Sequence, residues 1–403
     1  MGNSMLIGVV GKPNVGKSTF FKALTLADVL IANYPFATIK PNEGFGHIRV
    51  ECIEKFFSTK CNPRFGYCED GQRFVPVKVI DVAGLVPGAH EGKGMGNQFL
   101  DDLNQADALI HVIDCAGTTN ESGEPVPAGS YDPEKDILFL GEELDYWYLR
   151  ILKDGWDKIF RRIIQEKQDV TKILGKQMSG LGVNDKMVEA CLLELGLNKD
   201  DLKNWTEDDL FRIATKLRET TKPMIIACNK VDMPTGRANF ERLKAKYPKL
   251  LMVPCSAESE LALKEANKAG LIKYLPGDAD FIIKDESKLN DKQKNALNFI
   301  KANVLGKFGS TGVQTTMNAA VFDLLKYLAI FPGGIGKLQD SDGRTLPDCF
   351  LLKPNSTAID FAYFLHTDLG DGFIRAIDVK TKRTVGRDYP LHNLDVIEII
   401  SSK

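Results

Sequence analysis

Residues 11–19 read GKPNVGKST, and this stretch decides the fold that the rest of the chain must accommodate. It fits the pattern G-x-x-x-x-G-K-[ST], in which glycines let the backbone pass so close to a phosphate group that several N–H groups point at it. The apolar residues 6–10 predict a short buried strand, and residues 19–26 predict the first turns of a helix, whose N-terminus adds partial positive charge. This order of strand, loop and helix predicts a nucleotide phosphate site, against the alternative of a chance glycine-rich turn.

The residues of this loop have separate predicted tasks. Lys17 is expected to reach the β- and γ-phosphates, and Ser18 is expected to hold Mg²⁺. The backbone of the loop is expected to surround the phosphates. The predicted nucleotide contacts in this stretch are Gly11, Pro13, Asn14, Val15, Gly16, Lys17, Ser18 and Thr19.

A second motif, Asp81-x-x-Gly84, follows the strand-like residues 74–80. An aspartate at such a strand end lies on the magnesium side of a P-loop site, and Gly84 can donate its N–H group to the γ-phosphate. Residues 31–44 predict an irregular loop, where Thr38 is the candidate hydroxyl for Mg²⁺ and the γ-phosphate; a plain surface loop is the alternative. The predicted Mg²⁺ ligands are Ser18, Thr38 and Asp81, and the predicted catalytic groups include Lys17, Thr38 and Gly84.

Two further strand ends predict recognition of guanine. Asn229-Lys230-Val231-Asp232 follows the apolar residues 223–228, and Ser256-Ala257 follows residues 251–255. The Asp232 carboxylate would accept hydrogen bonds from the ring N1–H and the exocyclic amino group, while Asn229 would meet the N7/O6 edge and the Ala257 N–H would reach O6. Adenine lacks the two donors that Asp232 needs and would leave a buried carboxylate unpaired. The pattern therefore predicts that GTP and GDP bind in preference to ATP.

The order of predicted elements divides the chain into three parts. Residues 108–116 form another buried strand, after which strands and helices stop alternating. Asp132-Pro133 starts a helical stretch that has a weak point at Gly155, and further helices start at Asn184 and at Thr206, which forms a capping box with Asp209. The predicted division is an α/β, Rossmann-like P-loop domain at 1–131 and 220–325, an all-helical insertion at 132–219, and a C-terminal α+β module at 326–403.

Composition limits the class of protein. The chain has 403 residues, of which 43% are hydrophobic and 26% charged, as in ordinary globular proteins with two or three domains. Its net charge of −2 provides no overall attraction to nucleic acid, so any such contact needs a local basic patch. No apolar run is long enough for a membrane span and no signal peptide precedes the first strand, so a cytoplasmic protein is expected.

Eight cysteines are scattered along the chain, several of them in apolar, strand-like runs. Such positions favour reduced, buried thiols in a cytosolic protein. Cys52, Cys61 and Cys68 lie near one another in the sequence, but their spacing is wider than the tight C-x₂-C pairs that are typical of zinc sites. The spacing therefore disfavours zinc.

Two groups of basic residues are candidate contact surfaces. In both groups, a solvated face is nearly as good an explanation as a binding surface. The first group lies in the first predicted helix of the insertion, and the second group lies near the C-terminus. The residues are Lys158, Arg161, Arg162, Lys167, Lys172 and Lys176 in the first group, and Lys380, Lys382, Arg383 and Arg387 in the second.

With these motifs in view, the chain resembles the Obg-related P-loop GTPases of the translation-factor class, and within them the YchF-like group. NYPFATIKPNEG (residues 33–44) is similar to that group's switch I, and DVAGLVPGAHEGKGMGNQFL (residues 81–100) is similar to its switch II. The insertion lies where YchF-like proteins carry a helical coiled-coil domain. The segment LLKPNSTAIDFAYFLH (residues 351–366) resembles a TGS domain, which has a β-grasp fold.

The chain departs from the typical YchF pattern in one respect. Typical members have lost the lysine and aspartate of N-K-x-D and prefer ATP, whereas this chain keeps Asn229, Lys230 and Asp232. Leu85 stands where Ras-like enzymes carry a glutamine that orients water, so the resemblance implies slow intrinsic hydrolysis. In related GTPases an asparagine at the position of Asn14 helps to bind K⁺, which can replace an arginine finger; Asn14 is therefore also a catalytic candidate.

The sequence thus predicts a GTPase that hydrolyses GTP to GDP and phosphate with Mg²⁺, and with K⁺ as a further candidate ion. The resemblance implies a nucleotide-dependent switch that acts on the ribosome or another ribonucleoprotein through the helical and TGS domains. Alternatives from other classes are a P-loop ATPase or kinase, and a scaffold that uses nucleotide for stability without switching.

Overall fold

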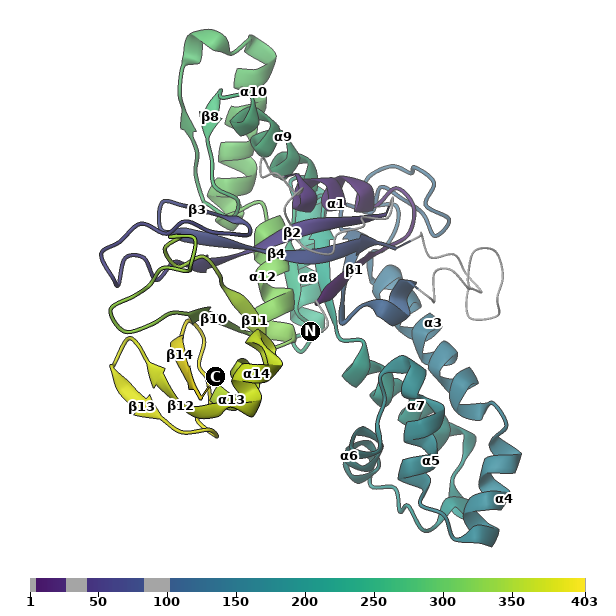
Figure 1. The fold of residues 1–403 in the computed structure, drawn as a ribbon. Helices are drawn as coiled ribbons and strands as arrows, with labels where there is room; N and C mark the ends of the chain where they lie inside the picture. The colour runs from purple at the N-terminus through teal and green to yellow at the C-terminus, as the bar shows by residue number, and fades with distance from the viewer. Residues whose placement is uncertain (1–4, 27–41, 83–101, 403) are drawn as a thin grey trace. The chain divides into compact units, whose positions relative to one another are not determined.

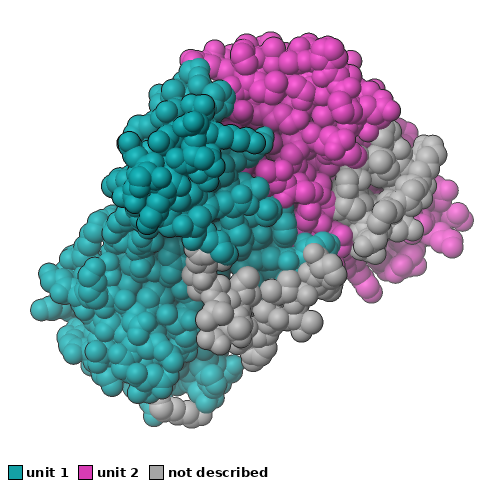
Figure 2. All heavy atoms as spheres, turned by 90° about the horizontal axis from the view of Figure 1, so that it is seen from above, with its two compact units in different colours: residues 1–5, 21–79, 258–403 teal, residues 6–20, 80–257 magenta. Residues whose placement is uncertain are grey.

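The computed structural model describes residues 5–26, 42–82 and 102–402 (Figure 1). These residues gather into two compact units, coloured in Figure 2. Unit 1 comprises residues 1–5, 21–79 and 258–403, and unit 2 comprises residues 6–20 and 80–257. Three residues with predicted roles, Thr38, Gly84 and Leu85, lie outside the described residues.

A parallel sheet forms the centre of unit 2. Its apolar strands are buried along their length, as expected of strands covered on both faces. Val9 is opposite Ile110, and Asp114 is opposite Asn229, so the polar strand ends that carry the motifs meet at one edge. The strands are, in spatial order, β1 (Leu6–Val10), β5 (Ala108–Asp114), β6 (Met224–Asn229) and β7 (Met252–Pro254). The end of β4 (Gln72–Asp81) lies beside β1, because the Val82 N–H group donates to the Val9 carbonyl at 3.0 Å.

Helices follow the motif-bearing strand ends. This arrangement confirms the predicted strand–loop–helix order at the P-loop and places a helix N-terminus beside each loop. The helices are α1 (Lys17–Thr25) after β1, α8 (Pro234–Lys246) after β6, and α9 (Ala257–Lys268) after β7.

Between β5 and β6 the chain is helical. Asn184 caps one helix through the Met187 N–H group, and Thr206 forms the predicted capping box with Asp209. Gly155, at φ 67°, separates α3 from α4. The first basic group therefore lies on α4, on α5 and, for Lys167, between them, and not, as predicted, on the first helix of the insertion. The elements are α3 (Glu134–Lys153), α4 (Trp156–Glu166), α5 (Val170–Gln177), α6 (Asp185–Leu195) and α7 (Glu207–Thr221), with 3-10 turns at Ser179–Leu181 and Leu202–Asn204.

The sequence analysis did not predict four of the strands in unit 1, which are β2, β3, β8 and β9. The strand β2 (Glu43–Glu51) precedes β3 (Tyr67–Glu69), which pairs antiparallel with β4. Within residues 259–325, β8 (Ile272–Lys273) and β9 (Ile282–Ile283) form a two-stranded ladder. The helices here are α10 (Asp291–Ile300), α11 (Gly306–Phe308) and α12 (Val313–Ala319), with a 3-10 turn at Glu286–Lys288 and π-helical turns at Lys301–Leu305 and Ala320–Leu324.

The C-terminal part of unit 1 is a mixed five-stranded sheet with the order β11-β10-β14-β12-β13. The pair β10 and β14 is parallel and the other pairs are antiparallel, and Ile330, Phe361 and Ile397 lie in a common core. This is the predicted α+β module with a β-grasp arrangement. Its elements are β10 (Leu328–Pro332), β11 (Phe350–Leu352), α13 (Ala358–Leu365), α14 (Thr367–Asp371), β12 (Phe373–Asp378), β13 (Arg383–Val385) and β14 (Val396–Ser401). Among the described residues, no helix has the length and apolar character needed to cross a bilayer.

Candidate nucleotide site

The predicted phosphate-binding loop joins the buried end of β1 to the start of α1, entirely within unit 2. Gly16 has φ 92°, and a Cβ atom built on it would lie 2.3 Å from the Asn229 Nδ2 atom. Val15 is buried beneath the loop, whereas Pro13, Asn14 and Ser18 are exposed. Glycine at position 16 therefore allows this left-handed backbone and the close approach of the Asn229 side chain, which a Cβ atom would block.

Lys17 and Asp81 meet at the carboxyl end of the sheet. The Lys17 Nζ atom forms an ion pair with the Asp81 Oδ1 atom, and the side chains are 12% and 21% exposed. Ser18 is the second residue of α1, next to Lys17. Among the described residues, Lys17, Ser18 and Asp81 thus lie at the same end of the sheet, and their ammonium and oxygen atoms are the donor types that phosphate and Mg²⁺ require.

Asn229 braces the loop from the base side. Its Nδ2 atom donates to the Val15 carbonyl at 2.9 Å, and its Oδ1 atom accepts from the Ala257 N–H group at 3.0 Å. The sequence analysis assigned Asn229 and Ala257 to the guanine edge and did not predict this link between them. Ser256 is buried beside Ala257, and Asp232 is half-buried at the following turn.

Lys230 holds the guanine-recognition loop against the phosphate-binding loop. Its backbone is left-handed at φ 64°, which turns the chain sharply after β6. The Lys230 Nζ atom donates to the Asn14 carbonyl at 3.2 Å and to the Asp114 Oδ2 atom at 2.9 Å. The two predicted motifs are therefore tied directly to each other.

Asp114, which the sequence analysis did not identify, anchors this arrangement. It is fully buried, and its carboxylate accepts from the Ala116 N–H, the Thr119 hydroxyl at 3.0 Å and the Lys230 ammonium. A buried carboxylate needs this number of donors to offset its lost hydration. Its position in the sequence was the available signal, because Asp114 ends an apolar strand just as Asp81 and Asn229 do.

Lys12 connects the phosphate-binding loop to helix α3. Its Nζ atom donates to the Asp136 Oδ1 atom at 2.9 Å and to the Thr119 carbonyl at 3.1 Å, and it lies 3.8 Å from the centre of the Tyr131 ring. Burial raises the pKa of Asp136 above its ordinary value, although Lys12 acts in the opposite direction. The sequence analysis gave Lys12 no role, since the motif leaves its position unspecified.

Asn14 and His111 also have defined surroundings in unit 2. The Asn14 Nδ2 atom donates to the Gly123 carbonyl at 2.9 Å, so the side chain braces two loops. His111 is buried in β5, where burial, with the nearby Lys12 charge, lowers its pKa to about 3. It is thus a neutral histidine in the core of unit 2.

Comparison with known proteins agrees with this geometry. Residues 6–142 match the family described as 50S ribosome-binding GTPase, residues 227–333 match the Obg-like GTPase YGR210-like, G4 motif-containing domain, and residues 336–401 match the TGS domain. A GTP-binding protein of Methanocaldococcus jannaschii is 50% identical over 398 residues, which cover 98% of this chain and 99% of that protein. The chain belongs to the Obg-related P-loop GTPases, in the YchF-like group.

Other members of this GTPase family show the same architecture or carry related names. The crystal structure of a GTP-binding protein from Pyrococcus horikoshii OT3 has a TM-score of 0.77 and 40% identity, and the match covers 98% of this chain and 100% of that chain. The Schizosaccharomyces pombe YchF GTPase, at 19% identity and TM-score 0.60 over 99% of this chain and 98% of its own, shows the fold alone. A protein of Mycoplasma genitalium named ribosome-binding ATPase YchF is 31% identical over 63% of this chain and 66% of its own length.

Proposed function

We propose that this chain hydrolyses GTP to GDP and phosphate and that nucleotide binding switches its contact with the ribosome or another ribonucleoprotein particle. The observation that carries the proposal is the intact Asn229-Lys230-x-Asp232 loop, tied to the phosphate-binding loop through the Val15 and Asn14 carbonyls. A guanine-recognition loop positioned by the phosphate-binding loop can read the base and the phosphates of one nucleotide together.

The residues of the chain have distinct roles in the proposed reaction. Bound Mg²⁺ would supply positive charge at the phosphate oxygens, held by Ser18, Asp81 and Thr38. The Lys17 ammonium would leave Asp81 and stabilise the negative charge that develops when water attacks the γ-phosphorus in line. Gly84 would contribute its N–H group to the same oxygens.

Nucleotide choice is the first test, because relatives at about 30% identity are named ATPases. An unpaired Asp232 carboxylate should cost at least about 2 kcal/mol, which corresponds to a GTP preference over ATP of roughly thirtyfold. Calorimetric titration of the purified chain with each Mg²⁺–nucleotide measures this ratio directly. Equal affinities would remove guanine recognition from the proposal and favour the ATPase alternative.

Phosphate release separates the remaining functions. If the chain is a ribosome-linked switch, it should release phosphate slowly by itself, because Leu85 cannot orient the attacking water. Adding ribosomes should make phosphate release faster. A kinase would transfer phosphate to an added small-molecule acceptor, and a nucleotide-stabilised scaffold would show a melting temperature that rises with GTP but no turnover under either condition. Either of these latter results would contradict the proposed switch.

The proposed switch keeps the division predicted from the sequence: a G domain at 1–131 and 220–325, a helical insertion at 132–219 and a TGS domain at 326–403. The Lys12–Asp136 ion pair supports communication between the phosphate-binding loop and the insertion, since it joins that loop to the first turn of α3. Asp136→Asn should therefore weaken the effect of ribosomes on phosphate release, whereas Asp157→Asn, in α4, should leave it unchanged.

The basic residues near the C-terminus are the proposed RNA contact. Lys382, Arg383 and Arg387 are exposed, whereas the Lys380 ammonium lies 5.9 Å from the centre of the Phe56 ring. Replacing the three exposed residues with alanine should reduce co-sedimentation with ribosomes and flatten its salt dependence. The matched control replaces Lys284, Lys288 and Lys292, which are also exposed. Equal co-sedimentation of both triple variants would exclude this patch.

A further inference from the structure

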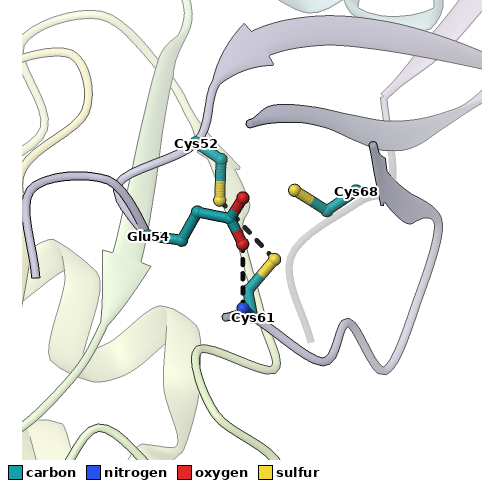
Figure 3. A group of neighbouring side chains, drawn as sticks. All are labelled: Cys52, Glu54, Cys61 and Cys68. Carbon is teal, nitrogen blue, oxygen red and sulfur yellow. Dashed lines mark hydrogen bonds between the residues drawn. The ribbon is translucent and has the colours of Figure 1, made fainter. Parts of the chain in front are cut away.

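Four side chains that no predicted motif includes meet in unit 1. Cys52, Glu54, Cys61 and Cys68 each offer one ligand atom, and these atoms all lie within 4.8 Å of one another. The three sulfur atoms point into the same small space, with the Glu54 carboxylate beside them (Figure 3). Cys52 and Glu54 are buried, and Cys61 and Cys68 are half-buried.

The distances between the ligand atoms are close to those between the ligands of a bound metal ion. The Cys52 and Cys61 Sγ atoms are 3.6 Å apart. Sulfur ligands of a tetrahedral zinc ion, at about 2.3 Å from the metal, lie about 3.8 Å from each other. A disulfide would require a separation of about 2.05 Å and would leave one of the three thiols without a partner. The cluster therefore needs smaller movements to accept a metal ion than to be oxidised.

The surrounding backbone explains why a metal ion would be useful here. The four residues border and occupy the irregular segment 52–66, between β2 and β3, where the chain has no ladder or helix to hold it. The Glu54 Oε2 atom accepts from the Cys61 N–H group at 2.9 Å, so this carboxylate already draws the two sides of the segment together. Irregular segments of this length are uncommon in compact units, and those that occur there often have a function.

The same segment supports the C-terminal module within unit 1. The Asn62 N–H group donates to the Thr345 carbonyl at 2.8 Å, and the Arg64 N–H group donates to the Pro347 carbonyl at 2.8 Å. The Arg64 guanidinium also pairs with Asp340 at 3.0 Å. A rigid segment 52–66 would therefore fix the position of residues 340–347.

We propose that Cys52, Cys61, Cys68 and Glu54 bind one Zn²⁺ ion, which braces the segment 52–66 against residues 340–347. Three sulfur donors and one carboxylate suit zinc and exclude Mg²⁺, which prefers oxygen ligands alone. Each cysteine binds as a thiolate, so its proton is released to solvent when the metal binds and no electron is transferred. The site is separate from the nucleotide motifs and its existence does not depend on the proposed GTPase activity.

Metal content of the reduced, full-length chain tests the proposal. We expect one zinc ion per chain by elemental mass spectrometry, and loss of this zinc in Cys52→Ala and Cys68→Ala. Cys191→Ala is the matched control, because Cys191 is also a buried free cysteine but lies in α6. Wild-type levels of zinc in the two cluster variants, or no zinc in the wild type together with no binding of added Zn²⁺, would overturn the proposal.

Two further measurements keep the test valid if a cysteine variant folds poorly. Glu54→Gln retains three thiolates and should weaken Zn²⁺ affinity by about tenfold or more while the chain stays folded. Added Co²⁺ should produce the visible absorption of a tetrahedral thiolate complex in the wild type and lose it in Cys68→Ala. A native mass lower by two hydrogens in chain prepared without reductant, with no metal bound, would show a disulfide and overturn the proposal.

Discussion

The nucleotide site and the cysteine cluster both lie where strands end, but they are assembled in different ways. In the nucleotide site, the principal side chains come from short motifs at the carboxyl ends of parallel strands, so the register of one sheet brings Asp114 and Asn229 together. In the cysteine cluster, Cys52, Glu54 and Cys61 lie in the irregular segment 52–66 and Cys68 lies in β3, and no sheet register sets the distances between their ligand atoms. The first site is held by sheet register and by side chains that tie its loops together, and the second is held by its own ligand side chains.

This difference predicts which kind of substitution should abolish each site. A site shaped by backbone is lost when a glycine gains a side chain, whereas a site made by converging ligands is lost when one ligand is removed. Each change should leave the other site intact, because Gly16 lies in unit 2 and the cluster lies in unit 1.

The largest effect is expected for Gly16→Ala. The added Cβ atom would lie 2.3 Å from Asn229 Nδ2 at a backbone φ of 92°, which costs several kcal/mol and should lower GTP affinity more than about a hundredfold. Zinc content should not change. Gly141→Ala, in α3, is the control: a Cβ atom there meets nothing within 4 Å, so GTP affinity should be unaffected and stability should stay equal or rise. Wild-type GTP affinity in Gly16→Ala would refute the assigned loop geometry.

Acid should destabilise both units through one histidine in each, the buried His111 and the half-buried His47. Burial lowers the pKa of His111 in unit 2 and of His47 in unit 1 to about 3. Because the unfolded chain binds a proton near pH 6.5 and the folded chain does not, stability falls as the pH drops from 6.5 toward 3, by up to about 3 kcal/mol per histidine at pH 4. Urea unfolding at pH 7 and pH 4 should show a smaller loss in His111→Leu and in His47→Leu than in the wild type.

The exposed His366 provides the control for the acid experiment. His366→Gln keeps both His111 and His47, so its loss of stability between pH 7 and pH 4 should match that of the wild type. If all three variants follow the wild-type curve, His111 and His47 are not responsible for the acid sensitivity.

Asp232→Asn should have a smaller effect, a loss of about 2 kcal/mol in the free energy of GTP binding. The amide can donate where the carboxylate could only accept, so GTP affinity should fall roughly thirtyfold and xanthine nucleotides should gain affinity. Fluorescent-nucleotide displacement by GTP and by XTP measures both changes. Asp201→Asn, at an exposed position in the helical segment, should bind GTP like the wild type. Unchanged GTP and XTP affinities in Asp232→Asn would place the base elsewhere.

The smallest expected effect concerns Asn14 and K⁺. The Asn14 Nδ2 atom is engaged by the Gly123 carbonyl, which leaves the amide oxygen as a possible ion ligand. GTP hydrolysis should be faster in KCl than in NaCl at equal ionic strength, on the order of threefold, or less than 1 kcal/mol in the barrier. Asn14→Ala should abolish the difference, and Leu85→Ala should preserve it. Identical rates in both salts for GTP-bound wild type would exclude the ion.

The sequence by itself determined the main architecture and the motifs from which the nucleotide site is predicted. GKPNVGKST, Asp81 and the loop from Asn229 to Asp232 were recognisable because each motif acts through local backbone geometry and residue chemistry, which short stretches encode. The helix starts at Asn184 and Thr206 were predictable for the same reason, since a cap is formed by residues that are neighbours in the chain. The short β8 and β9 were missed because two-residue strands have no readable period.

The tertiary structure alone decided which distant side chains meet. Lys12 reaches Asp136, and Lys230 reaches Asp114, across more than a hundred residues of chain, and neither pair follows a pattern of spacing. The spacing of Cys52, Cys61 and Cys68 argued against a metal site, whereas the fold places their sulfur atoms within 4.8 Å of one another. The physical reason is that such contacts depend on how β2, the irregular segment and β3 pack in space, and this packing is a property of the folded chain and not of any short stretch.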